Sequence, residues 1–315
     1  MEKLRIVFMG TPDFAVGILD TIYQNNYEIV GVITAADKPA GRGQKVSMSA
    51  VKAYALENNL RLLQPTNLKS EDFLAELKSL NANLQVVVAF RMLPEVVWKM
   101  PKYGTFNLHA SLLPEYRGAS PINWAIINGE TKTGVTSFFI DDKIDTGAMI
   151  LSKATEIGAN ETAGELHDRL MYLGSDTVLE TLQLIEKGEV TTTLQENNVD
   201  VKTAYKLNKD NCKIDWSQSG HTIFNLIRGL SPYPTAWTYI KDDENEWNVK
   251  IYLASFEEKT HPDVVGKITT SKKEIYISTK DGILKIESLQ FPGKKRMLAH
   301  ELLNGISFSE NTIAL

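Results

Sequence analysis

The sequence contains very little cysteine, no cluster of histidines and no long apolar run. Its one cysteine, Cys212, excludes a disulfide within the chain and a zinc site built from several thiolates. A chain of 315 residues without disulfides suits a reducing cytosol. The histidines are scattered without the spacing of metal ligands, so we expect no metal. They are His109, His167, His221, His261 and His300.

Apolar residues never extend far enough to cross a membrane, because a spanning helix needs about 18 of them in succession. The first apolar stretch, residues 4–9, is also too short for a secretory signal, and Gly10 and Pro12 end it. These absences predict a cytoplasmic protein with no membrane anchor.

The chain has no large excess of positive or negative charge, because its net charge is −5. A global basic field that draws the protein to nucleic acid is therefore excluded. Residues 206–315 hold 15 Lys and Arg against 14 Asp and Glu, whereas residues 1–205 hold 19 against 25. Any contact with nucleic acid must rest on local basic patches.

The first part of the chain alternates between strand and helix patterns. Residues 4–9 form a short apolar run that predicts a buried strand, residues 12–24 a helix, and residues 28–34 another strand. A long amphipathic helix is predicted at 162–187. This alternation over 1–188 predicts an α/β domain with a Rossmann-like, mostly parallel sheet.

Beyond that domain the pattern changes. Residues 189–205 are polar and lack a helical period, so we interpret them as a linker. Residues 206–315 contain several short β-type runs separated by turn residues. That spacing predicts a small C-terminal β-barrel, of the OB-like kind.

One stretch combines an amide, an imidazole and a carboxylate. Asn107 and His109 are two residues apart on a predicted strand, so their side chains share one side. Asp141, Asp142 and Asp145 lie in the loop between two further predicted strands, 135–140 and 149–154, and Asp145 precedes a Thr-Gly pair that lets the backbone bend. Such a set can hold an oxyanion and move a proton. The alternatives are a core histidine and ordinary Asx turns.

Two familiar kinds of site are not supported. The turn after the first strand has Gly10 but lacks the second and third glycines of a dinucleotide fingerprint, so we expect no nicotinamide cofactor. Ser111 lies close to His109, but the chain has no G-x-S-x-G elbow of a serine hydrolase.

Residues 35–48 are rich in glycine and cations, which predicts a mobile basic loop. Lys38, Arg42 and Lys45 could clamp phosphate, with Arg42 as the main contact, or the loop could be merely solvated. Two small basic clusters follow later, Lys272-Lys273 and residues 294–296, with the same two interpretations.

Together these residues resemble a known family. Asn107-Leu108-His109-Ala110-Ser111-Leu112-Leu113-Pro114, then Tyr116-Arg117-Gly118-Ala119-Ser120-Pro121-Ile122, then Asp145-Thr146-Gly147, is similar to the core of the folate-dependent formyltransferases. The resemblance extends from about residue 3 to about 306. Further similar stretches lie at 8–14, 37–43, 214–216, 227–230 and 293–297. One departure is at 90–93, where many members have smaller residues near the pterin.

The resemblance implies transfer of a formyl group from 10-formyltetrahydrofolate to the α-amino group of methionyl-initiator tRNA. It implies that Asn107 and His109 donate hydrogen bonds to the oxyanion, while Asp145 helps to take the proton from the amine. The folate site would be lined by Ser111, Leu112, Leu113 and Pro114, and the tRNA would be contacted by Arg42, Lys38 and Lys45.

The same resemblance implies that 1–188 is the catalytic domain, that 206–315 binds tRNA and that no metal is needed. We expect a monomer. Three rival functions stay open at this point. They are formylation of another amine, such as an amino sugar nucleotide or glycinamide ribonucleotide, hydrolysis of the folate, and inactive tRNA binding.

Overall fold

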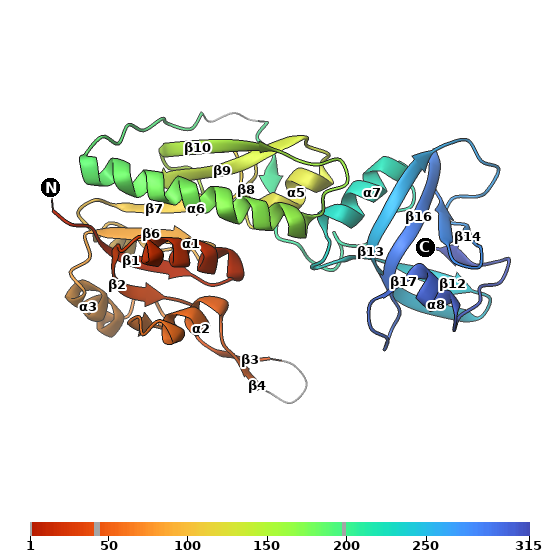
Figure 1. The fold of residues 1–315 in the computed structure, drawn as a ribbon, viewed down its shortest axis with the longest axis horizontal. Helices are drawn as coiled ribbons and strands as arrows, with labels where there is room; N and C mark the ends of the chain where they lie inside the picture. The colour runs from red at the N-terminus through yellow and green to blue at the C-terminus, as the bar shows by residue number, and fades with distance from the viewer. Residues whose placement is uncertain (1, 41–44, 197–199) are drawn as a thin grey trace. The chain divides into compact units, whose positions relative to one another are not determined.

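The computed structural model describes residues 2–40, 45–196 and 200–315, with side chains at 38–40 and 45–47 left out. The chain forms two compact units that alternate along the sequence (Figure 1). Unit 1 comprises Met1–Gly118, Gly134–Thr155 and His167–Thr203. Unit 2 comprises Ala119–Thr133, Glu156–Leu166 and Ala204–Leu315.

Unit 1 is built on a sheet with the strand order β10-β9-β7-β6-β1-β2-β5. Neighbouring pairs from β5 to β7 are parallel, and β9 runs antiparallel to β7. The Rossmann-like, mostly parallel sheet predicted from the sequence is therefore confirmed. The strands are β1 (Arg5–Gly10), β2 (Glu28–Ile33), β5 (Leu62–Leu63), β6 (Leu84–Val88), β7 (Thr105–His109), β9 (Lys132–Phe139) and β10 (Met149–Glu156). Two-residue strands lie at β8 (Arg117–Gly118) and β11 (Thr203–Ala204).

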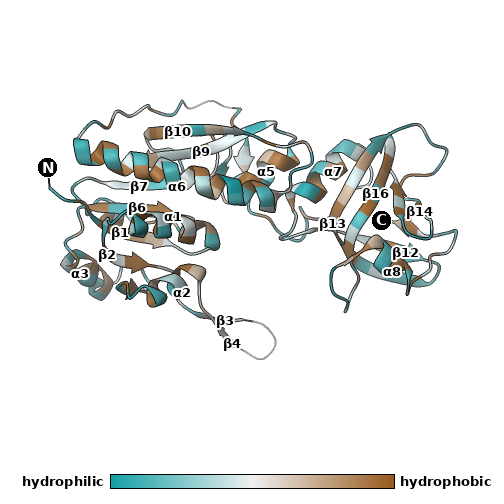
Figure 2. Ribbon diagram, in the orientation of Figure 1, coloured by the Kyte–Doolittle hydropathy of each residue, from teal (hydrophilic) through white to brown (hydrophobic). Residues whose placement is uncertain are grey.

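Helices cover both faces of this sheet. On one face lie α1 (Asp13–Gln24) and α6 (Ala163–Lys187) (Figure 1), which approach so closely that a Cβ on Gly17 would lie 2.5 Å from Met171. Hydrophobic and hydrophilic residues alternate along α6, as its predicted amphipathic pattern requires (Figure 2). The other face packs against α3 (Glu71–Ser79) and α4 (Glu95–Trp98). A further helix, α2 (Ala50–Glu57), begins at the N-cap Ser49.

The stretch predicted as a loop at 35–48 differs from expectation, because it contains the paired strands β3 (Lys38–Ala40) and β4 (Lys45–Ser47). Pro39 is tolerated there because a two-stranded ribbon leaves some N–H positions unpaired. Asp37 directly precedes β3. It forms an ion pair with Lys52 and accepts a hydrogen bond from Gln64 at 2.9 Å. These partners hold the pKa of Asp37 below its usual value. Arg42 lies outside the described residues.

Unit 2 contains an antiparallel sheet with the order β14-β15-β16-β13-β12-β18, and β17 pairs with β16. Its ends meet, since Ile268 N donates to Thr312 O (3.1 Å) and Ala314 N to Gly266 O (2.8 Å). The predicted C-terminal barrel is therefore confirmed as a nearly closed one. The strands are β12 (Ala236–Asp242), β13 (Asn245–Glu258), β14 (Ile268–Thr270), β15 (Ile275–Ser278), β16 (Gly282–Gln290), β17 (Met297–Leu298) and β18 (Ile313–Ala314).

Three helices accompany the barrel within unit 2: α5 (Pro121–Ile127), α7 (Gly220–Gly229) and α8 (Ala299–Leu303). Helix α5 packs on α7 so tightly that a Cβ on Gly229 would lie 2.7 Å from Ile127. This packing explains why residues 119–133 belong with unit 2, although the sequence placed them in the domain at 1–188. No described helix combines the length and the apolar character that crossing a membrane requires.

Candidate active site

The predicted amide and imidazole lie on β7, at the carboxyl edge of the parallel part of the sheet. Leu108 faces α6, where it contacts Gly174, so Asn107 and His109 face the opposite side. Asn107 is paired with Val87 on β6 and with Phe138 on β9. Ligands of open α/β sheets bind beyond this edge, so the placement suits a site.

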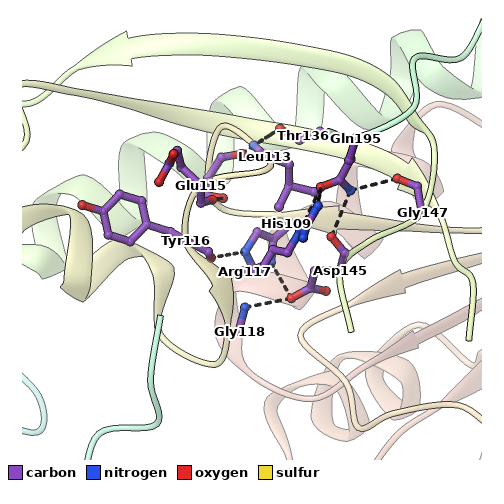
Figure 3. A network of polar contacts seen from close by, with 11 residues as sticks. His109, Leu113, Glu115, Tyr116, Arg117, Gly118, Thr136, Asp145, Gly147 and Gln195 are labelled. Carbon is purple, nitrogen blue, oxygen red and sulfur yellow. Dashed lines mark hydrogen bonds and ion pairs between the residues drawn. The ribbon is translucent and has the colours of Figure 1, made fainter. Parts of the chain in front are cut away.

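His109 is only 6% exposed, and each ring nitrogen faces an oxygen (Figure 3). Its Nε2 lies 2.7 Å from the carbonyl oxygen of Tyr116. Because a carbonyl can only accept, Nε2 carries the proton in this bond. Nδ1 lies 3.8 Å from Oδ2 of Asp145, which is longer than a hydrogen bond. Nδ1 is therefore the nitrogen that is free to act on a substrate.

Of the three aspartates considered in the sequence, Asp145 is the one that lies beside His109. Its Oδ2 accepts a hydrogen bond from Gly118 N at 2.9 Å. Asp141 instead accepts from Thr146 Oγ1 (2.7 Å) within its own loop, and Asp142 is exposed. Asp145 has φ +55°, a left-handed conformation that Asp tolerates better than most residues.

The side chain of Asn107 has an unmet hydrogen-bonding requirement. Its Oδ1 is buried and has no hydrogen-bond partner among the described residues. Buried polar atoms in folded proteins are nearly always paired, so such an atom indicates a ligand position. A formyl group attacked by an amine fits it, because the amide can accept from the amine and donate to the formyl oxygen.

The turn at 111–114 is fixed to β9 through Thr136. Thr136 Oγ1 donates to Ser111 O (2.7 Å) and accepts from Leu113 N (3.2 Å). The Ser111 hydroxyl is fully buried and donates to Glu115 O at 2.6 Å. The backbone of this turn is therefore held rigidly, and the serine hydroxyl is already in use. Leu112 and Pro114 keep part of their surface exposed.

Sequence reasoning missed the residue that holds the Asp145 loop. Gln195 donates from Nε2 to Asp145 O (2.9 Å) and to Gly147 O (2.8 Å), and Arg117 donates twice to its Oε1 (Figure 3). Gln195 lies within residues 189–205, which the sequence indicated as a linker. The stretch has no apolar period, so nothing in the sequence distinguished this glutamine from its polar neighbours.

Of the residues predicted to bind tRNA, the structure describes only the backbone of two. The backbone of Lys38 and Lys45 lies in the β3–β4 hairpin, and their side chains are outside the described part of the structure. At the position that departs from the expected pattern, Arg91 is exposed, and its guanidinium donates to the carbonyls of Pro65 and Thr66.

Fold and site together agree with one class of protein, and comparison with known families establishes it. The formyl transferase family matches residues 4–182, and its C-terminal domain matches residues 206–307. The chain belongs to the formyl transferase family, as its motifs predicted.

Curated relatives are similar over the whole chain. A methionyl-tRNA formyltransferase of Flavobacterium johnsoniae is 71% identical over 310 residues, which cover 98% of each chain. A methionyl-tRNA formyltransferase of Bacteroides thetaiotaomicron is 50% identical over 314 residues, again covering 98% of each chain.

Solved structures of lower identity share the fold. WlaRD, a sugar 3N-formyl transferase solved in the presence of dTDP and 5-N-formyl-THF, has a TM-score of 0.65 at 24% identity and covers 94% of this chain and 100% of its own. HypX from Aquifex aeolicus, in complex with tetrahydrofolic acid, has a TM-score of 0.63 at 19% identity and covers 96% of this chain and 47% of its own.

Proposed function

We propose that this chain formylates the α-amino group of methionyl-initiator tRNA with 10-formyltetrahydrofolate, for translation initiation. The observation that carries the proposal is the 71% identity, over 98% of both chains, to a methionyl-tRNA formyltransferase. Because charged tRNA is a cytoplasmic substrate, the enzyme acts in the cytoplasm. We also propose that it acts as a monomer, since each chain carries the whole set of site residues.

The folate supplies the formyl group, and Asn107 supplies the first catalytic contact. An α-amino group has a pKa of about 8, so part of it is already a neutral nucleophile at pH 7. As the amine attacks the formyl carbon, negative charge develops on the formyl oxygen. Nδ2 of Asn107 donates to that oxygen, while its unpartnered Oδ1 accepts from the attacking amine.

His109 and Asp145 complete the proposed catalytic set. Nδ1 of His109 faces the site, because Nε2 is held by Tyr116 O. Nδ1 makes no hydrogen bond to Asp145, which lies 3.8 Å away, and in the protonated imidazole it carries a hydrogen that it can donate to the developing oxyanion. Asp145 keeps one carboxylate oxygen, Oδ2, on Gly118 N, so Oδ1 is the oxygen that takes the amine proton, directly or through water. Collapse of the tetrahedral intermediate breaks the bond between the formyl carbon and N10 of the folate, and N10 takes up a proton, which balances the one lost by the amine, as tetrahydrofolate leaves. Proximity of the two substrates supplies much of the remaining acceleration.

The turn of Ser111, Leu112, Leu113 and Pro114 is proposed as the folate-binding segment. Its hydroxyl and one of its amides are used internally, so the turn presents mainly backbone and apolar surface. A rigid turn of this kind positions a flat pterin without losing side-chain entropy when the folate binds.

We propose two regions for tRNA contact. One is the β3–β4 hairpin with Arg42, Lys38 and Lys45. The other is a basic and aromatic face on the outside of the barrel, which we call the β12 face. It consists of Lys209, Lys213, Trp237 and Tyr239.

In the β12 face, cations lie over aromatic rings. Nζ of Lys209 lies 5.2 Å from the Trp237 ring, and Nζ of Lys213 lies 5.5 Å from the Tyr239 ring. The two rings meet edge to face at 5.4 Å. Surfaces that bind RNA commonly combine cations, which contact phosphates, with aromatic rings, on which bases stack. Net acidity of the whole chain does not oppose this, because the contact is local.

A transfer assay with four acceptors tests the proposed function. Methionyl-initiator tRNA should be formylated, whereas methionyl-elongator tRNA, free methionine and an amino sugar nucleotide should react far more slowly. Release of formate without an acceptor would indicate a hydrolase. Efficient use of the amino sugar in place of the tRNA would overturn the tRNA assignment.

A further inference from the structure

The segment that follows α6 is attached to the catalytic sheet immediately before Gln195. Thr193 and Met149 exchange two backbone hydrogen bonds, of 2.8 and 2.9 Å, across an antiparallel bridge to β10. Leu194 is 80% exposed, and Glu196 is exposed. Gln195 alone of these three turns inward, and its side chain is partly buried.

The amide of Gln195 can adopt only one orientation. Its Nε2 faces two carbonyl oxygens, those of Asp145 and Gly147, which can only accept. Its Oε1 faces Nε and Nη2 of Arg117, at 3.0 and 2.7 Å, which can only donate. A flipped amide would lose all four contacts, so Arg117 fixes the orientation in which Gln195 binds the loop.

The loop that Gln195 binds needs external support. Asp145 has φ +55°, in a region that L-residues disfavour. Two residues on, a Cβ at Gly147 would lie 1.6 Å from Phe139 O, so this close approach admits only glycine. Gln195 bridges the carbonyls of these two residues, and it therefore spans the bend that directs the Asp145 carboxylate toward Gly118 and His109.

We propose that Gln195 is a positioning residue for catalysis, which acts through Asp145 and is itself oriented by Arg117. This inference rests on the proposed function, because it assigns a role in the same formyl transfer. In the described hydrogen bonds, Gln195 contacts neither His109 nor the side chain of Asn107. Its removal should therefore slow the chemical step without weakening the binding of either substrate.

The test compares variants in single-turnover transfer to methionyl-initiator tRNA. Gln195→Ala should lower the rate about 10- to 100-fold, the usual effect of misplacing a catalytic group by about 1 Å. Gln195→Glu should be at least as slow, because a carboxylate cannot donate to the two carbonyls. The KM for folate and for tRNA should hardly change. Leu194→Ala, in the same segment, and Gln218→Ala, in unit 2, serve as controls with wild-type rates.

A double-mutant cycle separates positioning from general damage. If Gln195 acts through Asp145, adding Gln195→Ala to Asp145→Asn should produce little further loss. Independent effects that multiply, or a wild-type rate for Gln195→Ala, would overturn the proposal. Should Gln195→Ala fail to fold, Gln195→Asn and Arg117→Lys probe the same bonds. Absence of transfer by the wild-type chain would instead contradict the proposed function.

Discussion

Nδ1 of His109 and Oδ2 of Asp145 lie 3.8 Å apart, and each side chain is held from behind by the backbone of one short segment. Tyr116 O accepts a hydrogen bond from Nε2 of His109, and Gly118 N donates one to the carboxylate of Asp145. Residues 116–118 thus set the distance between the two groups. The pair is close enough to act on neighbouring atoms of one substrate, and too far apart for the two side chains to be engaged in a hydrogen bond with each other.

Replacing Asp145 by Asn should separate chemistry from binding. The amide keeps the size of the carboxylate and can still accept from Gly118 N, but it cannot take a proton. We expect the single-turnover rate to fall by about 100-fold or more. The Kd for tRNA should stay close to the wild-type value. Normal transfer by this variant would remove Asp145 from the catalytic set.

Asn107→Asp should be strongly inactivating, because it replaces the donor by a negative charge beside the developing oxyanion. Loss of one oxyanion donor lowers kcat about 10²- to 10³-fold, and the added charge should increase the loss. Rapid-quench measurement of transfer checks this. The exposed Asn25→Asp serves as a charge-matched control. Equal rates for the two variants would argue against an oxyanion contact.

Arg42→Ala should weaken the use of tRNA without changing the use of folate. Loss of a charged hydrogen bond to phosphate costs about 1.5–3 kcal/mol, which corresponds to a rise in KM for tRNA of about tenfold or more. The KM for folate should not move. Lys69→Ala, an exposed cation elsewhere in unit 1, provides the comparison. An unchanged KM for tRNA would eliminate the hairpin as a contact.

The β12 face can be tested through the salt dependence of tRNA binding. If Lys209 and Lys213 each neutralise a phosphate, replacing both by Gln should reduce the slope of log K against log salt by about 2. Replacement of Lys272 and Lys273, in the turn before β15, changes net charge equally. If the slope fell for the Lys272 and Lys273 variant and not for the Lys209 and Lys213 variant, the tRNA contact would lie at the turn before β15 instead.

Acid should weaken the barrel through Asp242. Ser309 N and Thr312 Oγ1 donate to this buried carboxylate at 3.0 and 2.6 Å and hold its pKa below the usual value. A depressed pKa stabilises the fold above the unfolded pKa of about 3.9, and this contribution is lost as pH falls through the folded value. Asp242→Asn should therefore destabilise by about 1–3 kcal/mol at pH 7 and by less below pH ~4.

Urea unfolding followed by tryptophan fluorescence at several pH values measures the effect of Asp242→Asn. Asp243→Asn, at the neighbouring exposed carboxylate, is the matched control. A difference between Asp242→Asn and the wild type that stays constant with pH would contradict the assignment to the ionised carboxylate.

The sequence predicted what depends on local period. Asn107 and His109 share a side because strand residues alternate, and the structure places them so. The strands of the barrel were visible as short apolar runs. Gln195 could not be found in this way, because it reaches Asp145 across 50 residues of sequence and its neighbours are equally polar. Nor does any local pattern reveal that α5 packs with α7.

The closure of the barrel by its final residues has a consequence for handling the protein. Until residues 312–315 are in place, β12 and β14 present open edges, and unpaired strand edges template aggregation. A tag that displaces β18, or proteolysis just before it, should therefore produce self-association of the barrel. Purification handles belong at the other end of the chain.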